Sequence, residues 1–339
     1  MAKQVRAAKE RVDRGLPLPD ASLTLTALID RYLAEGIDPN AAPNTRSAAA
    51  GVGRLVAKRI GGRKVIRLAP SDVSNLCSAM LEEGYSNSYA ARVRTFLGQV
   101  LKFAEAEGLV ARNVASLSRS SSFAPKERDR LTKSEVVALV DAARGDRLEA
   151  LVVVLATLGL RPGESTGLVW QDVDIDEGTV TIRRSLKRHS DPNTGTQVLR
   201  LGPTKTAGSV RTLALPAIAR AALRRRHVAQ AAERLAAGPY WRINEGLVFA
   251  TEIGTPIDPA DLQRTVRRVA EKAGISKRVS PYDFRHAAIS VLSDAGVSGE
   301  RIADVAGNDA KTALSVYRRP MGPVVDDAVG PMDALFGTD

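Results

Sequence analysis

The chain has 339 residues, a length that suggests two domains rather than one small core. Lysine and arginine number 49 against 38 aspartate and glutamate, and the resulting formal charge of +11 favours a polyanionic partner, nucleic acid first. A membrane partner is disfavoured, because the longest apolar run, Ala150 to Leu160, is too short to span a bilayer.

Residues 1–21 are charged, lack periodicity and predict an N-terminal tail without the apolar segment of a secretory signal. The single cysteine, Cys77, gives no disulfide framework and no thiolate metal cluster. The three histidines are far apart and lie in no recognised metal spacing. We therefore expect a cytoplasmic protein without a structural metal.

Residues 22–117 contain four apolar patterns with helical spacing and predict a four-helix module. Nine basic residues on the polar faces of these helices are suited to contact phosphates along a duplex, although a solvated surface is the more ordinary interpretation for any single one. These residues are Arg46, Arg54, Lys58, Arg59, Arg63, Lys64, Arg92, Arg94 and Lys102.

Residues 118–130 are polar, contain a proline and have no apolar period, so they predict a linker. Directly after it, Thr132 and Glu135 have the spacing of a capping box and predict the start of a helix. A second, mostly apolar helix is expected from Leu148 to Leu160. The domain that begins at residue 131 is predicted to end at residue 320.

Three segments of this second domain alternate like strands and predict one small antiparallel sheet: 178–186, 197–201 and 211–216. Helical patterns resume after them, over 217–236, 259–273, 283–295, 300–306 and 311–318. The predicted fold class is therefore mainly α with a small antiparallel sheet (α+β), in two domains.

Four segments carry the residues suited to chemistry: TLGLRPGE (157–164), GPTKTAGSVRTLALP (202–216), SPYDFRHAAIS (280–290) and AGNDAKTALSVYRRP (306–320). Considered singly, each has an ordinary structural explanation. Arg161 has Glu164 and Asp172 as candidate ion-pair partners. Lys205 lies on a hairpin tip, where a lysine is usually solvated. Arg285 falls in the first turns of a helix, whose free backbone N–H groups suit a phosphate.

In this order the four segments resemble the tyrosine recombinases, also called the phage integrase family. TLGLRPGE is similar to the first arginine box, the hairpin lysine to the β-strand lysine, YDFRH to the HxxRH box, and AGNDAKTALSVY to the terminal tyrosine box. Each box is degenerate, but their order and spacing are specific, with 124 residues from Arg161 to Arg285 and 32 from Arg285 to Tyr317. The resemblance implies a helical core-binding domain followed by a mixed catalytic domain.

The resemblance also implies a reaction. Arg161 and Arg285 would hold the nonbridging oxygens of the scissile phosphate, and Tyr317 would attack phosphorus. Lys205 would protonate the departing 5′-oxygen. The product would be a 3′-phosphotyrosyl link and a free 5′-hydroxyl, formed with neither ATP nor metal, so no cofactor is expected.

Two positions depart from the family pattern: Tyr282 stands where the HxxR box usually has histidine, and Asn308 where the terminal box usually has histidine or tryptophan. Both side chains donate a hydrogen bond, but neither is a useful proton acceptor at neutral pH. His286 lies one helical turn after Tyr282 and is a candidate to compensate, although the family places a packing histidine there as well.

We interpret the chain as a site-specific DNA recombinase, most simply an integrase of a mobile element or phage. The alternatives are a DNA-binding member of the fold with impaired cleavage and a type IB topoisomerase, which a long basic linker would favour. The implied partners are double-stranded DNA and a homotetramer on it, with accessory or directionality proteins left open. Residues 321–339 form a tail that docks on a neighbouring protomer in the family, or else a frayed terminus.

Overall fold

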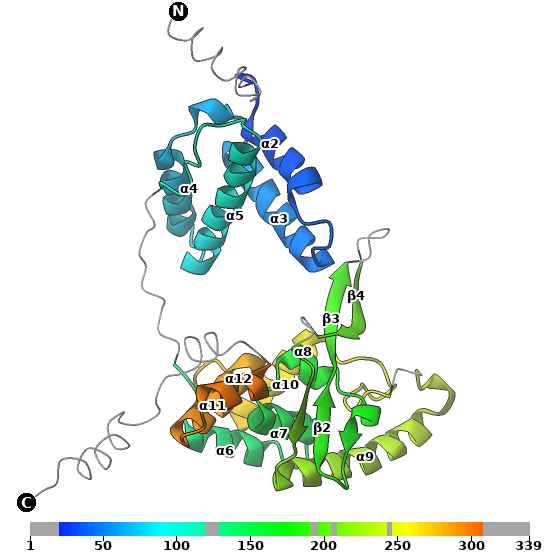
Figure 1. Ribbon diagram of the computed structural model, residues 1–339. Coiled ribbons are helices and arrows are strands. Elements are labelled where there is room, and N and C mark those ends of the chain that lie inside the picture. Colours follow the sequence, from blue (N-terminus) through cyan, green and yellow to red (C-terminus); the bar gives the residue numbers. More distant parts are fainter. Residues whose placement is uncertain (1–19, 119–128, 191–195, 205–208, 243–245, 308–339) are drawn as a thin grey trace, which may run out of the picture. The chain divides into compact units, whose positions relative to one another are not determined.

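The computed structural model describes residues 20–118, 129–190, 196–204, 209–242 and 246–307 (Figure 1). The chain separates into two units, with the boundary between Glu127 and Arg128, inside the segment expected to be a linker. Each unit has a hydrophobic core of its own. No helix among the described residues is long and apolar enough to cross a membrane.

The N-terminal unit is helical, as the four apolar patterns predict. Its helices are α2 (Leu25–Arg31), α3 (Pro43–Ile60), α4 (Pro70–Glu82) and α5 (Asn87–Ala106), with a π-helical turn at Tyr32–Gly36 and a 3₁₀ turn at Val65–Arg67. The side chains of Thr24 and Ser86 cap α2 and α5 by accepting from backbone N–H groups of the first turn. The periodic apolar residues of these helices face one another and form the core of the unit.

The C-terminal unit begins with the predicted capping box. The Thr132 hydroxyl accepts from the backbone N–H of Glu135 at 3.2 Å, and the Glu135 carboxylate accepts from that of Thr132 at 2.7 Å. The helices of this unit are α6 (Lys133–Ala142), α7 (Glu149–Leu158), α8 (Pro162–Thr166), α9 (Ala217–Ala237), α10 (Pro259–Lys272), α11 (Pro281–Asp294) and α12 (Gly299–Ala306), with 3₁₀ turns at Trp170–Asp172 and Gly238–Tyr240.

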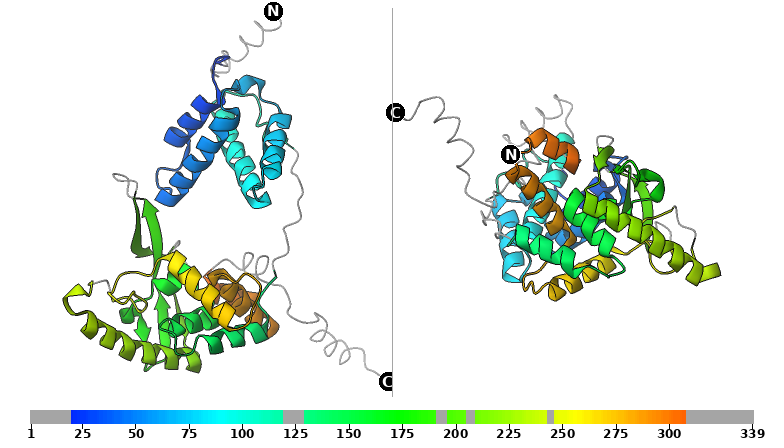
Figure 2. Two further views of the ribbon diagram at one scale, coloured as in Figure 1. Left: turned by 180° about the vertical axis from the view of Figure 1, so that it is seen from behind. Right: turned by 90° about the horizontal axis from the view of Figure 1, so that it is seen from below.

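The predicted strand segments 197–201 and 211–216 correspond to one strand each, whereas 178–186 is divided between two strands and a further short strand precedes it. The strands form two sheets rather than one. β1 (Val173–Asp174), β2 (Thr179–Ile182) and β5 (Arg211–Ala214) make an antiparallel sheet in the order β1-β2-β5. β3 (Arg184–Ser190) and β4 (Gln197–Pro203) pair only with each other among the described strands. This two-stranded ribbon extends away from the three-stranded sheet (Figures 1 and 2). The segment from β4 to β5 therefore connects two sheets and is not a simple hairpin.

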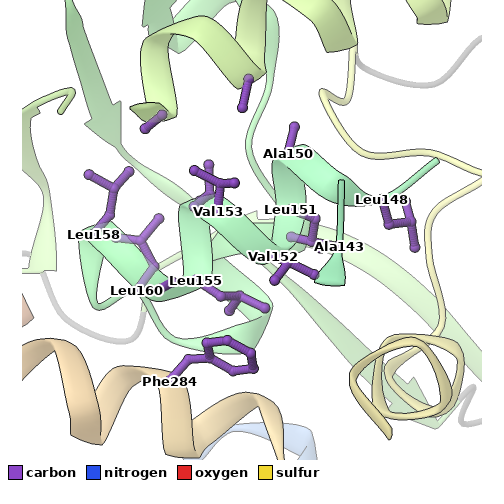
Figure 3. Packing of buried hydrophobic residues seen from close by; sticks show 14 of the residues in the cluster. Ala143, Leu148, Ala150, Leu151, Val152, Val153, Leu155, Leu158, Leu160 and Phe284 are labelled. Atoms are coloured by element: carbon purple, nitrogen blue, oxygen red, sulfur yellow. The ribbon is translucent and has the colours of Figure 1, made fainter. Parts of the chain in front are cut away.

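The core of the C-terminal unit surrounds α7, whose apolar residues are buried along almost its whole length. Phe284 of α11 is fully buried, and its ring lies beside Leu155 of α7 (Figure 3). This packing holds α11 against α7 and fixes the position of the next residue, Arg285. The left-handed Gly159 (φ +59°) ends α7 and turns the chain toward Arg161.

Candidate active site

Arg161 lies at the N-cap position of α8, where Pro162 begins the helix. Of its two candidate partners, the structure pairs it with Glu164: Nη1 lies 2.6 Å from Oε1, and the backbone N–H of Arg161 donates to Oε2 at 3.1 Å. The other candidate, Asp172, pairs with Arg183 and Arg184. The side chain of Arg161 keeps 27% of its surface exposed, so solvent and ligands reach it.

Arg285 lies in the second turn of α11 and is fully buried. Its Nη1 donates to the carbonyl oxygen of Gly159 at 2.7 Å, and its Nη2 donates to that of Ala306 at 2.8 Å. A buried guanidinium requires such acceptors, because an unpaired charge out of water is costly. Arg285 thus links the end of α7 to the end of α12.

Glu164 is a buried carboxylate that binds two arginines. Besides the hydrogen bond from Arg161, it accepts one from Nη2 of Arg211, on β5, at 2.9 Å. Burial raises the pKa of this carboxyl, but the charges and hydrogen bonds of Arg211 and Arg161 outweigh it, and the net pKa lies below its usual value. Glu164 is therefore ionised at neutral pH and orients both guanidinium groups.

Three arginines donate hydrogen bonds to the C-terminal end of α12. Three successive carbonyl oxygens each accept from a different one: Val305 from Nε of Arg211 at 2.7 Å, Ala306 from Arg285 at 2.8 Å, and Gly307 from Nη2 of Arg161 at 2.8 Å. Carbonyls at a helix C-terminus have no partner inside the helix and carry its negative dipole end, so they attract cations. Arg161 and Arg285 are thus held on adjacent carbonyls.

The remaining predicted site residues divide into two groups. Tyr282 lies on the first turn of α11 with 51% of its surface exposed, and His286, one turn later, is half-buried. Lys205, Asn308 and Tyr317 lie outside the described residues, as does the predicted helix 311–318. The described residues contain no group of three or more histidine, cysteine, aspartate or glutamate side chains that could hold a metal ion.

Sequence reasoning did not single out Arg211. A signal for it exists in the alternation of β5, where Leu213 is buried and Arg211, two residues earlier, shares its face. A charged residue on the inward face of a strand indicates a buried partner. The partner oxygens on α12 belong to the backbone, however, and backbone acceptors leave no mark in the residue pattern.

Comparison with known proteins identifies the family. The family model described as the phage integrase family matches residues 129–321. An integrase of Streptomyces ambofaciens is 30% identical over 326 residues, covering 95% of this chain and 83% of that protein. A XerC-like tyrosine recombinase of Caldanaerobacter subterraneus is 24% identical over 353 residues, covering 98% of this chain and 90% of that protein.

Solved structures share the fold. The Tn1549 transposon integrase in complex with a circular-intermediate DNA superposes with a TM-score of 0.75 at 20% identity, covering 93% of this chain and all of that one. A lambda integrase dimer bound to a core site gives 0.66 at 17% identity, covering 94% and 82%. These structures confirm the mainly helical fold class. The family match and the 30% identical relative show that the chain belongs to the phage integrase family and is a tyrosine recombinase, which confirms the resemblance.

Proposed function

We propose that this chain is a site-specific DNA recombinase that integrates and excises a mobile element by exchanging strands through a covalent link between Tyr317 and a 3′-phosphate. The observation that supports this most is the pairing of Arg161 and Arg285 on the adjacent carbonyls of Gly307 and Ala306. Two arginines 124 residues apart converge on the helix end from which the chain continues to Tyr317.

The two arginines address the main obstacle to attack on a phosphodiester, which is the negative charge of its oxygens. Guanidinium groups bind phosphate oxygens in a planar fork and stay charged at any relevant pH. Arg161 is partly exposed to solvent, so a phosphate can approach it directly. Arg285 is fully buried, so its contact with a phosphate requires neighbouring side chains to move.

In the proposed cleavage step the Tyr317 oxygen forms a bond to phosphorus while the bond from phosphorus to the 5′-oxygen breaks. Tyr317 loses its phenolic proton to water, and Lys205 donates a proton to the departing 5′-oxygen. Phenol has an ordinary pKa of about 10, and in the proposed site Arg161 and the sequence neighbours Arg318 and Arg319 would favour its ionised form. Attack by a 5′-hydroxyl of another duplex reverses the step and joins the new strand.

The proposed partner is double-stranded DNA, and the proposed assembly on it is a tetramer. The +11 charge of the chain supports the first. The second draws on a fold shared with lambda integrase, which has been solved as a dimer on a core site and as a tetramer on a Holliday junction. In this assembly, residues 321–339 would dock on a neighbouring protomer.

Covalent trapping tests the proposal. The DNA site is first recovered by selecting bound fragments from a randomised duplex library and by comparison with repeats that flank the gene. A duplex of that sequence, nicked so that the cleaved fragment diffuses away, is incubated with the protein and resolved under denaturing conditions. We expect a protein–DNA adduct that Tyr317→Phe abolishes without loss of binding. Tight binding by the wild type without any adduct would contradict the proposal and favour a binding-only protein.

A further inference from the structure

Arg211 makes three hydrogen bonds to three different parts of the C-terminal unit. Its Nη2 reaches the carboxylate of Glu164 at 2.9 Å, its Nε the carbonyl of Val305 at 2.7 Å, and its Nη1 the carbonyl of Ser209 at 3.0 Å. Only 8% of its side chain is exposed, and only 3% of that of Glu164. Solvent therefore screens the ion pair of Arg211 and Glu164 very little, and water does not easily take the place of either side chain.

Each of these acceptors lies next to a part of the proposed catalytic site. Glu164 orients Arg161 through Nη1, Val305 directly precedes the carbonyls that hold Arg285 and Arg161, and Ser209 follows the loop of Lys205 in the sequence. We infer that Arg211 is a positioning residue of the strand-transfer site, which holds the carboxylate of Glu164 and fixes Arg161 together with the end of α12. The inference rests on the proposed function.

Loss of Arg211 would act on Glu164 first. The charged groups bound to this carboxylate are Arg161, from the start of α8, and Arg211, from β5, while α12 contributes backbone carbonyls to the cluster. Without Arg211 the carboxylate keeps one cation instead of two but remains buried, and burial favours its neutral form. A neutral Glu164 has a weaker hold on Arg161, so the guanidinium loses its fixed orientation.

The backbone around Arg211 is fitted to this side chain. A Cβ atom at Gly307 would lie 2.8 Å from Nη1 and 3.1 Å from Cζ of Arg211, closer than side-chain atoms normally approach. The absence of a side chain at Gly307 therefore lets the guanidinium reach the α12 carbonyls. The position of the α12 carbonyls and the ionisation of Glu164 thus both depend on Arg211. Variants that change its charge and its shape separately distinguish the two effects.

The test compares Arg211→Met, which keeps the length without the charge, with Arg211→Lys, which keeps the charge without the planar fork. Arg225→Met is the matched control, because it removes an arginine from an exposed ion pair with Glu149. The probe is the nicked duplex of the trapping experiment. We expect Arg211→Met to bind this duplex within about twofold of wild type and to form adduct about 100-fold more slowly at pH 7, the size of effect that a misplaced group produces.

The pH profile separates positioning from general structural damage. For Arg211→Met we expect the rate of adduct formation to fall more steeply than that of wild type as the pH is lowered, because loss of Arg211 raises the pKa of Glu164. Arg211→Lys should restore the wild-type profile while recovering only part of the rate. The double variant Arg211→Met/Glu164→Gln should be slow but should lose the additional dependence on pH, because the titrating carboxyl is gone.

Hydrogen exchange of the peptide 299–307 supplies a readout that requires no activity. It should be faster in Arg211→Met than in wild type and unchanged in Arg225→Met. If wild type forms no adduct, the proposed function fails, and this exchange still decides the role of Arg211 at the end of α12. The inference is overturned if Arg211→Met matches wild type in rate and exchange, or if its rate falls equally at every pH together with a lower melting temperature.

Discussion

Arg161 and Arg285 are the same residue type in very different surroundings. Arg161 keeps 27% of its side chain exposed and is bound to Glu164 and Gly307, whereas Arg285 is the largest fully buried side chain of the described chain. An exposed arginine contributes little to folding, while a buried one occupies volume and satisfies buried carbonyls. Substitutions at the two positions should therefore separate chemistry from stability.

At position 161 we expect loss of chemistry at little cost in stability. Arg161→Ala removes a guanidinium from the proposed phosphate site and should slow adduct formation about 100-fold or more. Glu164 still has Arg211, so the free energy of unfolding should fall by only about 1–2 kcal/mol. Trapping on the nicked duplex and thermal unfolding measure the two effects. A large loss of DNA affinity with an unchanged cleavage rate would contradict this.

At position 285 alanine should damage the fold as well. Arg285→Ala leaves a void where the side chain joins the ends of α7 and α12 and deprives the carbonyls of Gly159 and Ala306 of their donors, so we expect about 3 kcal/mol or more of destabilisation. Arg285→Lys keeps the charge and one donor, and should retain most of the stability while still losing strand transfer. Thermal unfolding measures the stability of both variants. An Arg285→Ala variant as stable as Arg285→Lys would refute the expectation.

Arg161, Arg211 and Arg285 all donate to carbonyl oxygens at the end of α12. A substitution at Gly307 tests whether their close approach to this helix end matters. Gly307 has φ +60°, and an added Cβ would also crowd Arg211. Gly296 is a matched control, because it has φ +74° but nothing within 4 Å of an added Cβ. Both alanine variants should incur the backbone strain of about 1–2 kcal/mol.

Gly307→Ala should cost more than that and should also slow adduct formation, because it moves the guanidinium of Arg211. The measurements are the melting temperature and the trapping rate, each relative to Gly296→Ala. Equal melting temperatures and equal rates for the two variants would show that the close approach of Arg211 to Gly307 has no consequence.

The elements themselves were largely predictable from local patterns. Helical periodicity placed the four helices of the N-terminal unit, and the spacing of Thr132 and Glu135 placed the start of α6, because caps and amphipathic faces depend on neighbours in sequence. The division of the strands into two sheets was not predictable. Alternation tells which residues form strands, but pairing over a distance is decided by register and connection, which local patterns do not contain.

The site was predictable to the same degree. The pair of Arg161 and Glu164 lies within one turn and was among the two expected pairings. The link of Arg211 to Val305 spans 94 positions and ends on a backbone carbonyl, so no residue type marks it. The family resemblance named the reactive residues. The structure adds the buried carboxylate and the helix end that organise two of them.

For the whole molecule, the net charge overstates the number of cations available to DNA. Of the nine basic residues expected to contact phosphates, five have partners within the N-terminal unit: Arg46, Arg59, Arg63, Lys64 and Arg94. Arg54 and Lys58 are exposed and lie one turn apart on α3. They are the stronger candidates for contact with the DNA backbone.

The dependence of DNA binding on salt measures this difference. Each phosphate contact that is lost reduces the slope of log affinity against log salt by about 1. We expect Arg54→Gln/Lys58→Gln to reduce the slope by about 2, and the matched double variant Arg59→Gln/Arg63→Gln to change it less, because those arginines are already paired with Glu83 and Asp72. Titration of the selected duplex at several salt concentrations gives both slopes, and equal reductions would argue against the distinction.

The two units should also differ in their response to acid. In the C-terminal unit, burial raises the pKa of Glu233, but hydrogen bonds and charge from Arg226 and Arg147 outweigh it, and the net pKa is lowered. Asp146, bonded to Arg268, and Glu164 follow the same balance. In the N-terminal unit the carboxyl with a pKa lowered by an arginine is Glu83, which is exposed, so its ion pair with Arg59 contributes little.

A carboxyl whose pKa is lower in the folded than in the unfolded state stabilises the fold above its unfolded pKa of about 4.3, and this contribution is lost as the pH falls further. The C-terminal unit should therefore lose more stability between pH 5 and pH 3. Both tryptophans, Trp170 and Trp241, belong to it, so their fluorescence follows its unfolding alone, while circular dichroism follows both units.

We expect the fluorescence midpoint of thermal unfolding to fall from pH 5 to pH 3 by more than that of the helix signal assigned to the N-terminal unit. Glu233→Gln should lower stability at pH 7 by about 3 kcal/mol, because it leaves the buried Arg226 without its charged partner. It should also make the fall toward pH 3 smaller, because a glutamine does not titrate. A fall as large as that of wild type would show that Glu233 is not among the carboxylates through which acid unfolds this unit.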